Sequence, residues 1–198
     1  MQAILLDFFG VIAQPRYITN TIAAFLKKDM AGVRPIYQSY ERGELTREAF
    51  WKKMGVKDHA RIEQRLIETF KLDADFKAVH EELKKNYAIA IVSNADAFLL
   101  RSLLKRFGIA DAFEAVVISE EVKSAKPDAA IYRKACAALG VNASECVFVD
   151  DRQENLETAK DLGMTTVFHL VEPEKNEYKA DYAIDSLRGL LEIAEEIL

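Results

Sequence analysis

The chain has 198 residues, of which half are hydrophobic and 30% are charged, and its formal net charge is −5 at pH 7. These values predict one large domain, or a domain with a modest insertion, built around a sizeable hydrophobic core. The sequence has no basic patch and no apolar run of about 18 residues, so we exclude nucleic acid and a membrane as partners.

The first residues and the cysteines indicate the cellular compartment of the protein. Met1 leads directly into an apolar run rather than into a signal peptide. Cys136 and Cys146 lie in apolar helix and strand patterns, where we expect reduced core thiols instead of a disulfide or a metal site. We therefore expect a cytoplasmic protein, as a monomer or a homodimer.

The chain opens with a pattern typical of a buried parallel strand. Ala3 to Leu6 are all apolar, as in a strand that is covered on both faces. Asp7 ends this run, and Gly10 allows a sharp exit. Because ligands of open α/β sheets bind at the carboxyl ends of the strands, Asp7 is a candidate reacting group.

The next part of the chain, to about residue 78, shows helical periodicity without a strand pattern. We expect helices over residues 18–28, 35–40, 46–54 and 60–70, the third of them capped by Thr46. This block predicts a helical insertion of residues 14–78 after the first strand.

From residue 76 onward, helix and strand patterns alternate. We expect strands over residues 87–92, 112–118, 146–149, 165–169 and 183–184, and helices over residues 76–86, 97–107, 128–139, 154–162 and 187–198. Such alternation predicts right-handed βαβ units, and therefore an α/β fold with a doubly wound parallel sheet.

Four polar segments fall at one edge of this predicted sheet. They are Asp7, Ser93-Asn94, Lys126-Pro127-Asp128 and Asp150-Asp151. Each has a structural alternative: Asp7 as a turn residue that accepts from nearby backbone N–H groups, Ser93 or Asn94 as a helix cap, Lys126 as a solvated loop residue, and one Asp of the pair as a cap. The second carboxylate of that pair has no such explanation, because one helix start needs only one cap.

The carboxylates of Asp7, Asp150 and Asp151 would together carry about three negative charges. Two acids within about 4 Å repel by several kcal/mol at a partly buried site, so a cation or a proton shift must compensate. Mg²⁺, which prefers carboxylate, water and phosphate oxygens, suits these ligands. With Lys126 adding positive charge, a phosphate held by Ser93 and backbone N–H groups could react with Asp7 to form an aspartyl-phosphate.

The order and spacing of these segments resemble the haloacid dehalogenase-like (HAD) hydrolase superfamily over nearly the full chain. The matching segments are Leu6-Asp7-Phe8-Phe9-Gly10-Val11-Ile12, Val92-Ser93-Asn94, Lys126-Pro127-Asp128-Ala129-Ala130-Ile131-Tyr132, Phe148-Val149-Asp150-Asp151 with Asn155, and then Ala159 with Leu162-Gly163-Met164. The resemblance implies a Rossmann-like core of residues 1–13 and 79–198, with residues 14–78 as a small helical cap.

The resemblance also implies a chemistry for these residues. Asp7 would be the nucleophile, and Ser93 and Lys126 would bind the phosphoryl group as catalytic residues. We add Asn94 and Gly10 to the predicted phosphate-binding set. The implied function is that of a hydrolase of small phosphorylated metabolites, acting through an aspartyl-phosphate.

Mg²⁺ is the cofactor that the resemblance implies. Its ligands would be Asp7, the backbone carbonyl oxygen of Phe9, and Asp150. We expect Asp151 to bind the ion directly or through water.

Phe9 departs from the family pattern. Most phosphatases of this family carry a second Asp at this place, two residues after the nucleophile, as general acid and base. Phenylalanine cannot transfer a proton, and loss of a positioned general acid typically costs about 10²–10⁴-fold in rate. Metal binding is expected to survive, because it needs only the backbone oxygen of this residue.

Two other functions stay open on the sequence. Family dehalogenases also have an aromatic residue at the place of Phe9, so Asp7 could attack carbon in a 2-haloacid. Against this, Asp150-Asp151 is similar to the phosphatase metal site, whereas those dehalogenases carry serines and an asparagine there and use no metal. The third function is a phosphate-binding module that has lost turnover because of Phe9.

Overall fold

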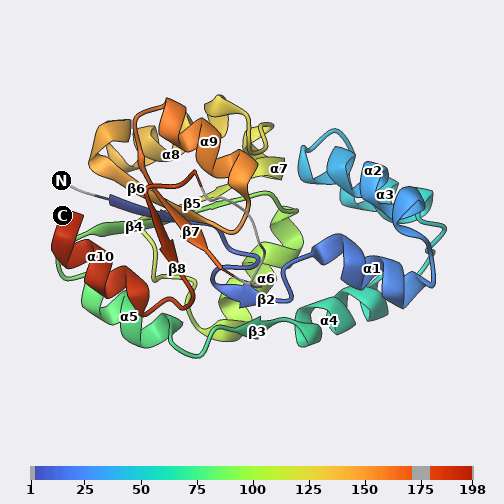
Figure 1. Cartoon of the computed structure of the whole chain (residues 1–198). Coiled ribbons are helices and arrows are strands. Elements are labelled where there is room, and N and C mark those ends of the chain that lie inside the picture. Colours follow the sequence, from blue (N-terminus) through green and yellow to red (C-terminus); the bar gives the residue numbers. More distant parts are fainter. Residues whose placement is uncertain (1–2, 171–178, 198) are drawn as a thin grey trace.

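The centre of the protein is a six-stranded parallel sheet (Figure 1), seen in a computed structural model that describes residues 3–170 and 179–197. The order across the sheet is β5-β4-β1-β6-β7-β8. The strands are β1 (Ala3–Leu6), β4 (Ala88–Ser93), β5 (Ala115–Ile118), β6 (Cys146–Asp150), β7 (Thr165–His169) and β8 (Tyr182–Ile184). The predicted α/β fold with a doubly wound parallel sheet is confirmed.

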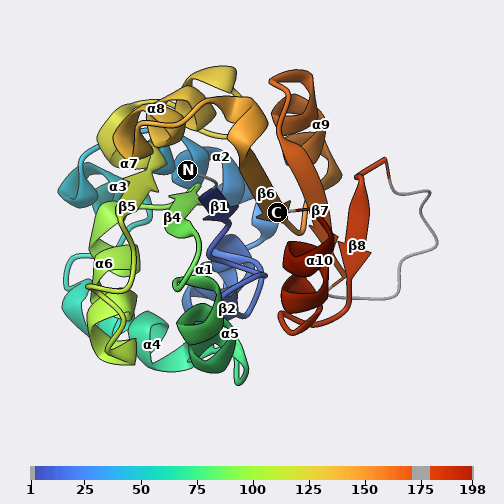
Figure 2. The ribbon, with the colours of Figure 1, turned by 90° about the vertical axis from the view of Figure 1, so that its left-hand side faces the viewer.

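Helices cover both faces of the sheet (Figure 2). The helices α8 (Ala129–Leu139) and α9 (Gln153–Asp161) cover one face, and α5 (Phe76–Leu83), α6 (Ala97–Phe107) and α10 (Gly189–Ile197) cover the other. Alternate side chains of β1 point to opposite faces: Ala3 and Leu5 pack on the side of α8 and α9, and Ile4 and Leu6 on the other side. Two short helices, α7 (Ser119–Val122) and the 3-10 helix η1 (Ala143–Glu145), were not predicted.

Four helices lie together on one side of the core (Figure 1) and form the inserted segment, which we define as residues 14–78. They are α1 (Ile18–Leu26), α2 (Met30–Glu41), α3 (Arg47–Lys53) and α4 (Ala60–Thr69). The predicted cap of α3 is confirmed, because the Thr46 side chain accepts a hydrogen bond from the Ala49 N–H at 3.2 Å. Helix α2 begins five residues before the predicted Pro35, because Asp29 caps it by accepting from the Gly32 N–H at 2.7 Å.

The expectation of an uninterrupted helical block is wrong where the segment meets the core. There β2 (Ala13–Gln14) and β3 (Lys71–Leu72) pair as a small antiparallel ribbon, separate from the main sheet. Strands of two residues are too short to show a periodic pattern in the sequence. The predicted boundary at residue 78 also falls inside α5, which packs against α10 of the core.

That residues 14–78 act as a cap domain stays a prediction. Within the parts of the chain that the structure describes, no helix is both long enough and apolar enough to cross a membrane.

Candidate active site

Asp7 lies at the carboxyl end of the central strand. β1 ends with Leu6 paired to Ile91 of β4 and to Val149 of β6. The Asp7 N–H extends this pairing by donating to the Val149 carbonyl oxygen at 2.9 Å. The carboxylate is buried, and its Oδ1 accepts a hydrogen bond from the Phe8 N–H at 2.7 Å. The backbone on both sides of Asp7 therefore fixes the position of its carboxylate.

Lys126 is buried and connects two carboxylates. Its Nζ lies 2.9 Å from Asp7 Oδ1 and 2.7 Å from Asp150 Oδ2. The Asn94 side chain holds the backbone of this lysine, since Nδ2 donates to the Lys126 carbonyl oxygen at 2.8 Å and Oδ1 accepts from the Lys126 N–H at 2.7 Å. The alternative of a solvated loop lysine is therefore excluded, and Asn94 has a role in positioning Lys126.

Ser93 and Asn94 do not cap the helix that follows them. Helix α6 is capped by Asp96, whose side chain accepts from the Leu99 N–H at 2.9 Å. Ser93 is fully buried at the end of β4, and its hydroxyl has no hydrogen-bond partner among the described residues. Buried hydroxyls usually have a partner. Ser93 does not border the pocket described below, so phosphate binding by Ser93 stays a prediction.

Asp150, at the end of β6, is held by Arg152 just before α9 and by Asn155 in the first turn of α9. Its Oδ1 accepts from the Arg152 N–H at 2.8 Å. The Asn155 side chain donates from Nδ2 to the same carboxylate, at 3.0 Å from each oxygen. Together with Lys126, these donors orient Asp150 toward Asp7, and neither Asp of the pair is the N-cap of α9.

Asp151 contacts a different cation. Arg16, in the loop before α1, places Nε 2.5 Å from Asp151 Oδ2 and donates from Nη2 to the Asp151 carbonyl oxygen at 2.5 Å. Gly10, with φ of +95°, lies so close that an added Cβ would be 2.1 Å from Asp151 Oδ2. Only glycine combines this positive φ with the absence of a Cβ at the contact with Asp151. The Gly10 N–H itself donates to the Ala13 carbonyl oxygen at 2.8 Å, so phosphate binding by Gly10 stays a prediction.

Burial and mutual repulsion change the pKa values of this cluster. Burial raises the pKa of Asp7 to about 6, against the opposing charge of Lys126 and with the help of Asp150. Burial and the charges of Asp150 and Asp7 raise the pKa of Asp151 to about 8, despite Arg16. Burial alone would lower the pKa of Lys126, but Asp150 and Asp7 outweigh it and raise the value. These shifts show that burial and repulsion among the three carboxyls outweigh the attraction of Lys126 and Arg16 for Asp7 and Asp151.

The three carboxylates are close enough to share one metal ion. Asp7, Asp150 and Asp151 are all buried, and one oxygen atom from each lies within 4.8 Å of the others. Among the described residues, none donates a hydrogen bond to the Phe9 carbonyl oxygen, which leaves it free as a ligand. Hard oxygen donors, whose mutual repulsion a bound cation would relieve, fit Mg²⁺.

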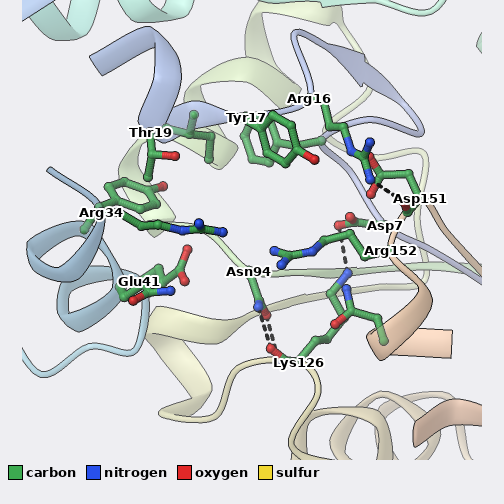
Figure 3. A pocket seen from close by; sticks show the side chains of 15 residues that line it. Asp7, Arg16, Tyr17, Thr19, Arg34, Glu41, Asn94, Lys126, Asp151 and Arg152 are labelled. Atoms are coloured by element: carbon green, nitrogen blue, oxygen red, sulfur yellow. Dashed lines mark hydrogen bonds and ion pairs between the residues drawn. The ribbon is translucent and has the colours of Figure 1, made fainter. Parts of the chain in front are cut away.

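The cluster borders a pocket between the edge of the sheet and the inserted segment (Figure 3). Its cavity volume is about 90 Å³, several times what one water molecule needs. The core contributes Asp7, Asn94, Lys126, Asp151, Arg152 and Asn155, and the inserted segment contributes Arg16, Arg34 and Glu41 among others. The pocket is therefore lined mainly by charged and polar residues.

Several charged residues of the pocket were not predicted from the sequence. They are Arg16, Arg34, Glu41 and Arg152. The first three come from the inserted segment, where no regular spacing relates them to Asp7. Arg152 directly follows the Asp150-Asp151 pair, and that position was the one signal from which it could have been found.

Comparison with known proteins places these residues in a family context. The model of the haloacid dehalogenase-like hydrolases matches residues 1–163. Glyceraldehyde 3-phosphate phosphatase of Methanopyrus kandleri is 37% identical over 101 residues, which cover 48% of this chain and 43% of that protein. (S)-2-haloacid dehalogenase 4A of Burkholderia cepacia is 30% identical over 116 residues, which cover 57% of this chain and 50% of that protein. The match thus spans half or less of the length of these relatives.

Solved structures share the fold over almost the whole chain. A HAD phosphatase from Thermococcus onnurineus superposes with a TM-score of 0.76 at 24% identity and covers 98% of both chains. A HAD family enzyme from Bacteroides thetaiotaomicron, in complex with magnesium and inorganic phosphate, superposes with a TM-score of 0.70 at 20% identity, over 89% of this chain and 98% of that one. At these sequence identities, the structural similarity shows a shared fold and nothing more specific.

Proposed function

Because this chain belongs to the haloacid dehalogenase-like hydrolases, we propose that it is a Mg²⁺-dependent phosphatase of small phosphorylated metabolites that acts through an aspartyl-phosphate on Asp7. One observation carries the proposal. Lys126 is buried in contact with both Asp7 and Asp150, beside a third carboxylate, at the border of a pocket lined by cationic side chains.

In the first step of the proposed reaction, a carboxylate oxygen of Asp7 attacks phosphorus. The new O–P bond forms as the P–O bond to the leaving group breaks. Lys126 holds Asp7 in position and offsets the charge of the phosphoryl oxygens. Mg²⁺, held by Asp7, the Phe9 carbonyl oxygen, Asp150 and Asp151, would neutralise the charge that otherwise keeps an anionic ester from an anionic nucleophile. The leaving oxygen takes its proton from water, since Phe9 has none to give.

In the second step, water attacks the phosphorus of the aspartyl-phosphate. The bond between phosphorus and the Asp7 oxygen breaks, inorganic phosphate leaves, and the carboxylate is restored. The proton of the attacking water passes to solvent, because the side chain of Phe9 cannot accept it. Lys126 again balances the charge of Asp7 as it is released.

Carbon–halogen hydrolysis is the second candidate, because one relative is a haloacid dehalogenase and the aromatic Phe9 borders the pocket. Both reactions use Asp7 as the nucleophile. A reaction at carbon does not explain why Asp150 and Asp151 are buried beside Asp7. An anionic phosphate ester needs a cation near the nucleophile, and these two acids can bind one. The cluster therefore favours the phosphatase.

The experiment that tests the proposal measures phosphate release from a panel of aryl, acyl and alkyl phosphates, with Mg²⁺ and with EDTA. Chloride release from 2-chloropropionate is measured in parallel. We expect phosphate release that needs Mg²⁺ and no release of chloride. Chloride release without Mg²⁺ would support the dehalogenase. Binding of phosphate esters without turnover would support the binding module.

The replacement Asp7→Asn tests the nucleophile. It leaves the side chain similar in shape but removes the attacking oxygen charge, so we expect phosphate release to fall below a few per cent of the wild-type rate. A thermal unfolding curve close to that of the wild type would show that the fold is intact. Substantial remaining turnover by the folded variant would assign the chemistry to another group.

A further inference from the structure

Two guanidinium groups face one another across the pocket. Arg34 comes from α2 in the inserted segment, and Arg152 comes from the turn between β6 and α9. Both border the pocket that contains Asp7, and Figure 3 shows their side chains entering it from opposite sides and pointing toward one another. Like charges that converge in this way repel, unless an anion lies between them.

Three of the four cationic side chains of the pocket already have acidic partners. The ion pairs are Lys126 with Asp7 and Asp150, Arg16 with Asp151, and Arg152 with Glu154, which does not border the pocket. Arg34 differs from them, because it forms no ion pair or hydrogen bond with any residue in the described ranges 3–170 and 179–197. Among these four cations, Arg34 is therefore the one without an acidic partner in the described residues.

Glu41 is the acid that the inserted segment contributes to this pocket. Burial raises its pKa to about 7, even though Arg152 and Arg42 act to lower it. At neutral pH this carboxyl is therefore charged for only part of the time. Glu41 therefore does not neutralise both guanidinium groups, and an anion bound beside Arg34 could neutralise the charge of that side chain.

We propose that Arg34, together with Arg152, binds a carboxylate on the leaving-group side of the substrate, so that the preferred substrates are phosphate esters of small carboxylic acids. This inference rests on the proposed phosphatase function. A guanidinium group donates two parallel hydrogen bonds to a carboxylate. With a cavity of about 90 Å³, a planar carboxylate is favoured over a bulkier second phosphate.

The test compares two esters that differ in one group. 3-Phosphoglycerate carries a carboxylate where glycerol 3-phosphate carries a hydroxymethyl group. Each is measured as a competitive inhibitor of p-nitrophenyl phosphate hydrolysis by the Mg²⁺-loaded protein. We expect the inhibition constant of 3-phosphoglycerate to be lower by about 10-fold to 100-fold, the range of one charge-assisted pair. Propane-1,3-diol bisphosphate is measured in the same way, because it carries a second phosphate in place of the carboxylate.

The variant Arg34→Gln assigns this preference to one side chain. We expect the ratio of the two inhibition constants to fall to within about 3-fold of unity, because an amide lacks the charge. Arg61, an exposed arginine of α4 that does not border the pocket, is the matched control, and Arg61→Gln should keep the wild-type ratio. Both inhibition constants of a ratio are measured on the same protein, so a general loss of activity in a variant does not change the ratio.

Each outcome decides between the two proposals. Equal inhibition by both esters in the wild type, or an unchanged ratio in Arg34→Gln, would overturn the carboxylate site while the phosphatase stands. Stronger binding of the bisphosphate than of 3-phosphoglycerate would overturn the choice of carboxylate. Failure to hydrolyse any phosphate ester would overturn the proposed function, and calorimetric affinities for the same two esters would then test the site directly.

Discussion

Phe9 occupies the place at which the family's phosphatases carry a general acid, and its packing explains how the chain accommodates an aromatic residue there. Its ring lies edge-on against Phe8, with centroids 4.9 Å apart, and against Phe70 of the inserted segment, at 5.0 Å. The side chain is only 5% exposed. Phe9 therefore joins the core to the inserted segment by apolar contact, two residues after Asp7.

The first prediction concerns proton transfer at this residue. Without a neighbouring acid, the leaving oxygen departs as an anion or takes a proton from water, so wild-type turnover should be much slower for alkyl than for aryl phosphates. Phe9→Asp should raise kcat on alkyl phosphates by about 10²-fold, near the low end for general acid catalysis. Steady-state rates on glycerol 3-phosphate and p-nitrophenyl phosphate measure both effects.

This comparison needs folded protein, because a carboxylate at this place replaces a buried ring and costs stability. Circular dichroism and a thermal unfolding curve provide that control. If the wild type cleaves alkyl and aryl phosphates equally fast, another residue supplies the proton and this account of Phe9 is wrong.

Gly10 allows a second prediction at the residue scale, with a matched control elsewhere in the chain. Gly10 and Gly163 have similar positive φ values of +95° and +90°, but an added Cβ meets Asp151 Oδ2 at 2.1 Å in the first case and nothing within 4 Å in the second. Both alanine variants should lose about 1 kcal/mol from backbone strain. Only Gly10→Ala should also displace Asp151, and with it lower Mg²⁺ affinity and turnover.

Urea unfolding and calorimetric titration with Mg²⁺ separate the two effects. Equal Mg²⁺ affinity in the Gly10→Ala and Gly163→Ala variants would show that the contact between Gly10 and Asp151 does not shape the metal site.

At the scale of elements, Asp96 connects the inserted segment to the core. It caps α6, and it accepts hydrogen bonds from the hydroxyls of Tyr37 at 3.2 Å and Tyr40 at 3.4 Å, both on α2. The Ser119 hydroxyl adds a second link by donating to the Glu41 carbonyl oxygen at 2.5 Å. These contacts place α2, and with it Arg34 and Glu41, over the carboxyl edge of the sheet.

The third prediction concerns the pH dependence of this connection. Burial raises the pKa of Asp96 from its ordinary value of 3.8 to about 6. Since the native state has the higher pKa, it binds the proton more tightly, and this stability is complete below about pH 3.8 and is lost as the pH rises through about 6. Between pH 7 and pH 5, the wild type should therefore gain about 1 kcal/mol of unfolding free energy relative to Asp96→Asn.

Urea unfolding at the two pH values measures this difference, and asparagine retains the capping function at position 96. The variant Asp29→Asn makes the same replacement at the exposed cap of α2 and is the matched control for the loss of a capping carboxylate. A constant difference between wild type and Asp96→Asn at both pH values would mean that Asp96 is ionised in the native state throughout.

For the whole molecule, we predict that the acidic cluster couples stability to Mg²⁺ binding. Asp7 follows β1, Asp150 is the last residue of β6 and Asp151 follows it, so the site exists only when the two strands are paired. An ion that binds only the native state stabilises it by about 2.7 kcal/mol at 100 times its dissociation constant. For a protein of this size, we predict that saturating Mg²⁺ raises Tm by roughly 5–10 °C.

Thermal unfolding with Mg²⁺ and with EDTA provides the measurement for this fourth prediction. Asp150→Ala should abolish the shift, whereas Asp161→Ala, which removes an exposed carboxylate at the end of α9, should retain it. A shift of equal size in both variants would place the ion elsewhere on the molecule.

The sequence by itself determined the elements whose signal is local. The apolar runs of β1, β4 and β6 indicated strands, and the helical pattern of residues 97–107 matches α6. The same runs placed Asp7 and Asp150 at one edge of the sheet, because parallel strands bring their carboxyl ends together. These features depend on residues that are neighbours in sequence.

The tertiary structure alone decided what depends on contacts between distant segments. The ribbon of β2 and β3 joins residues from the two ends of the inserted segment, and two-residue strands carry no periodic signal. Arg16 contacts Asp151, which lies 135 residues further along the chain. Arg34 borders the pocket because hydrogen bonds from Tyr37 and Tyr40 to Asp96 hold α2 beside the start of α6. Polar side chains of an inserted segment have no periodicity that relates them to a site on the core, so their place in the pocket emerges only when both parts are folded together.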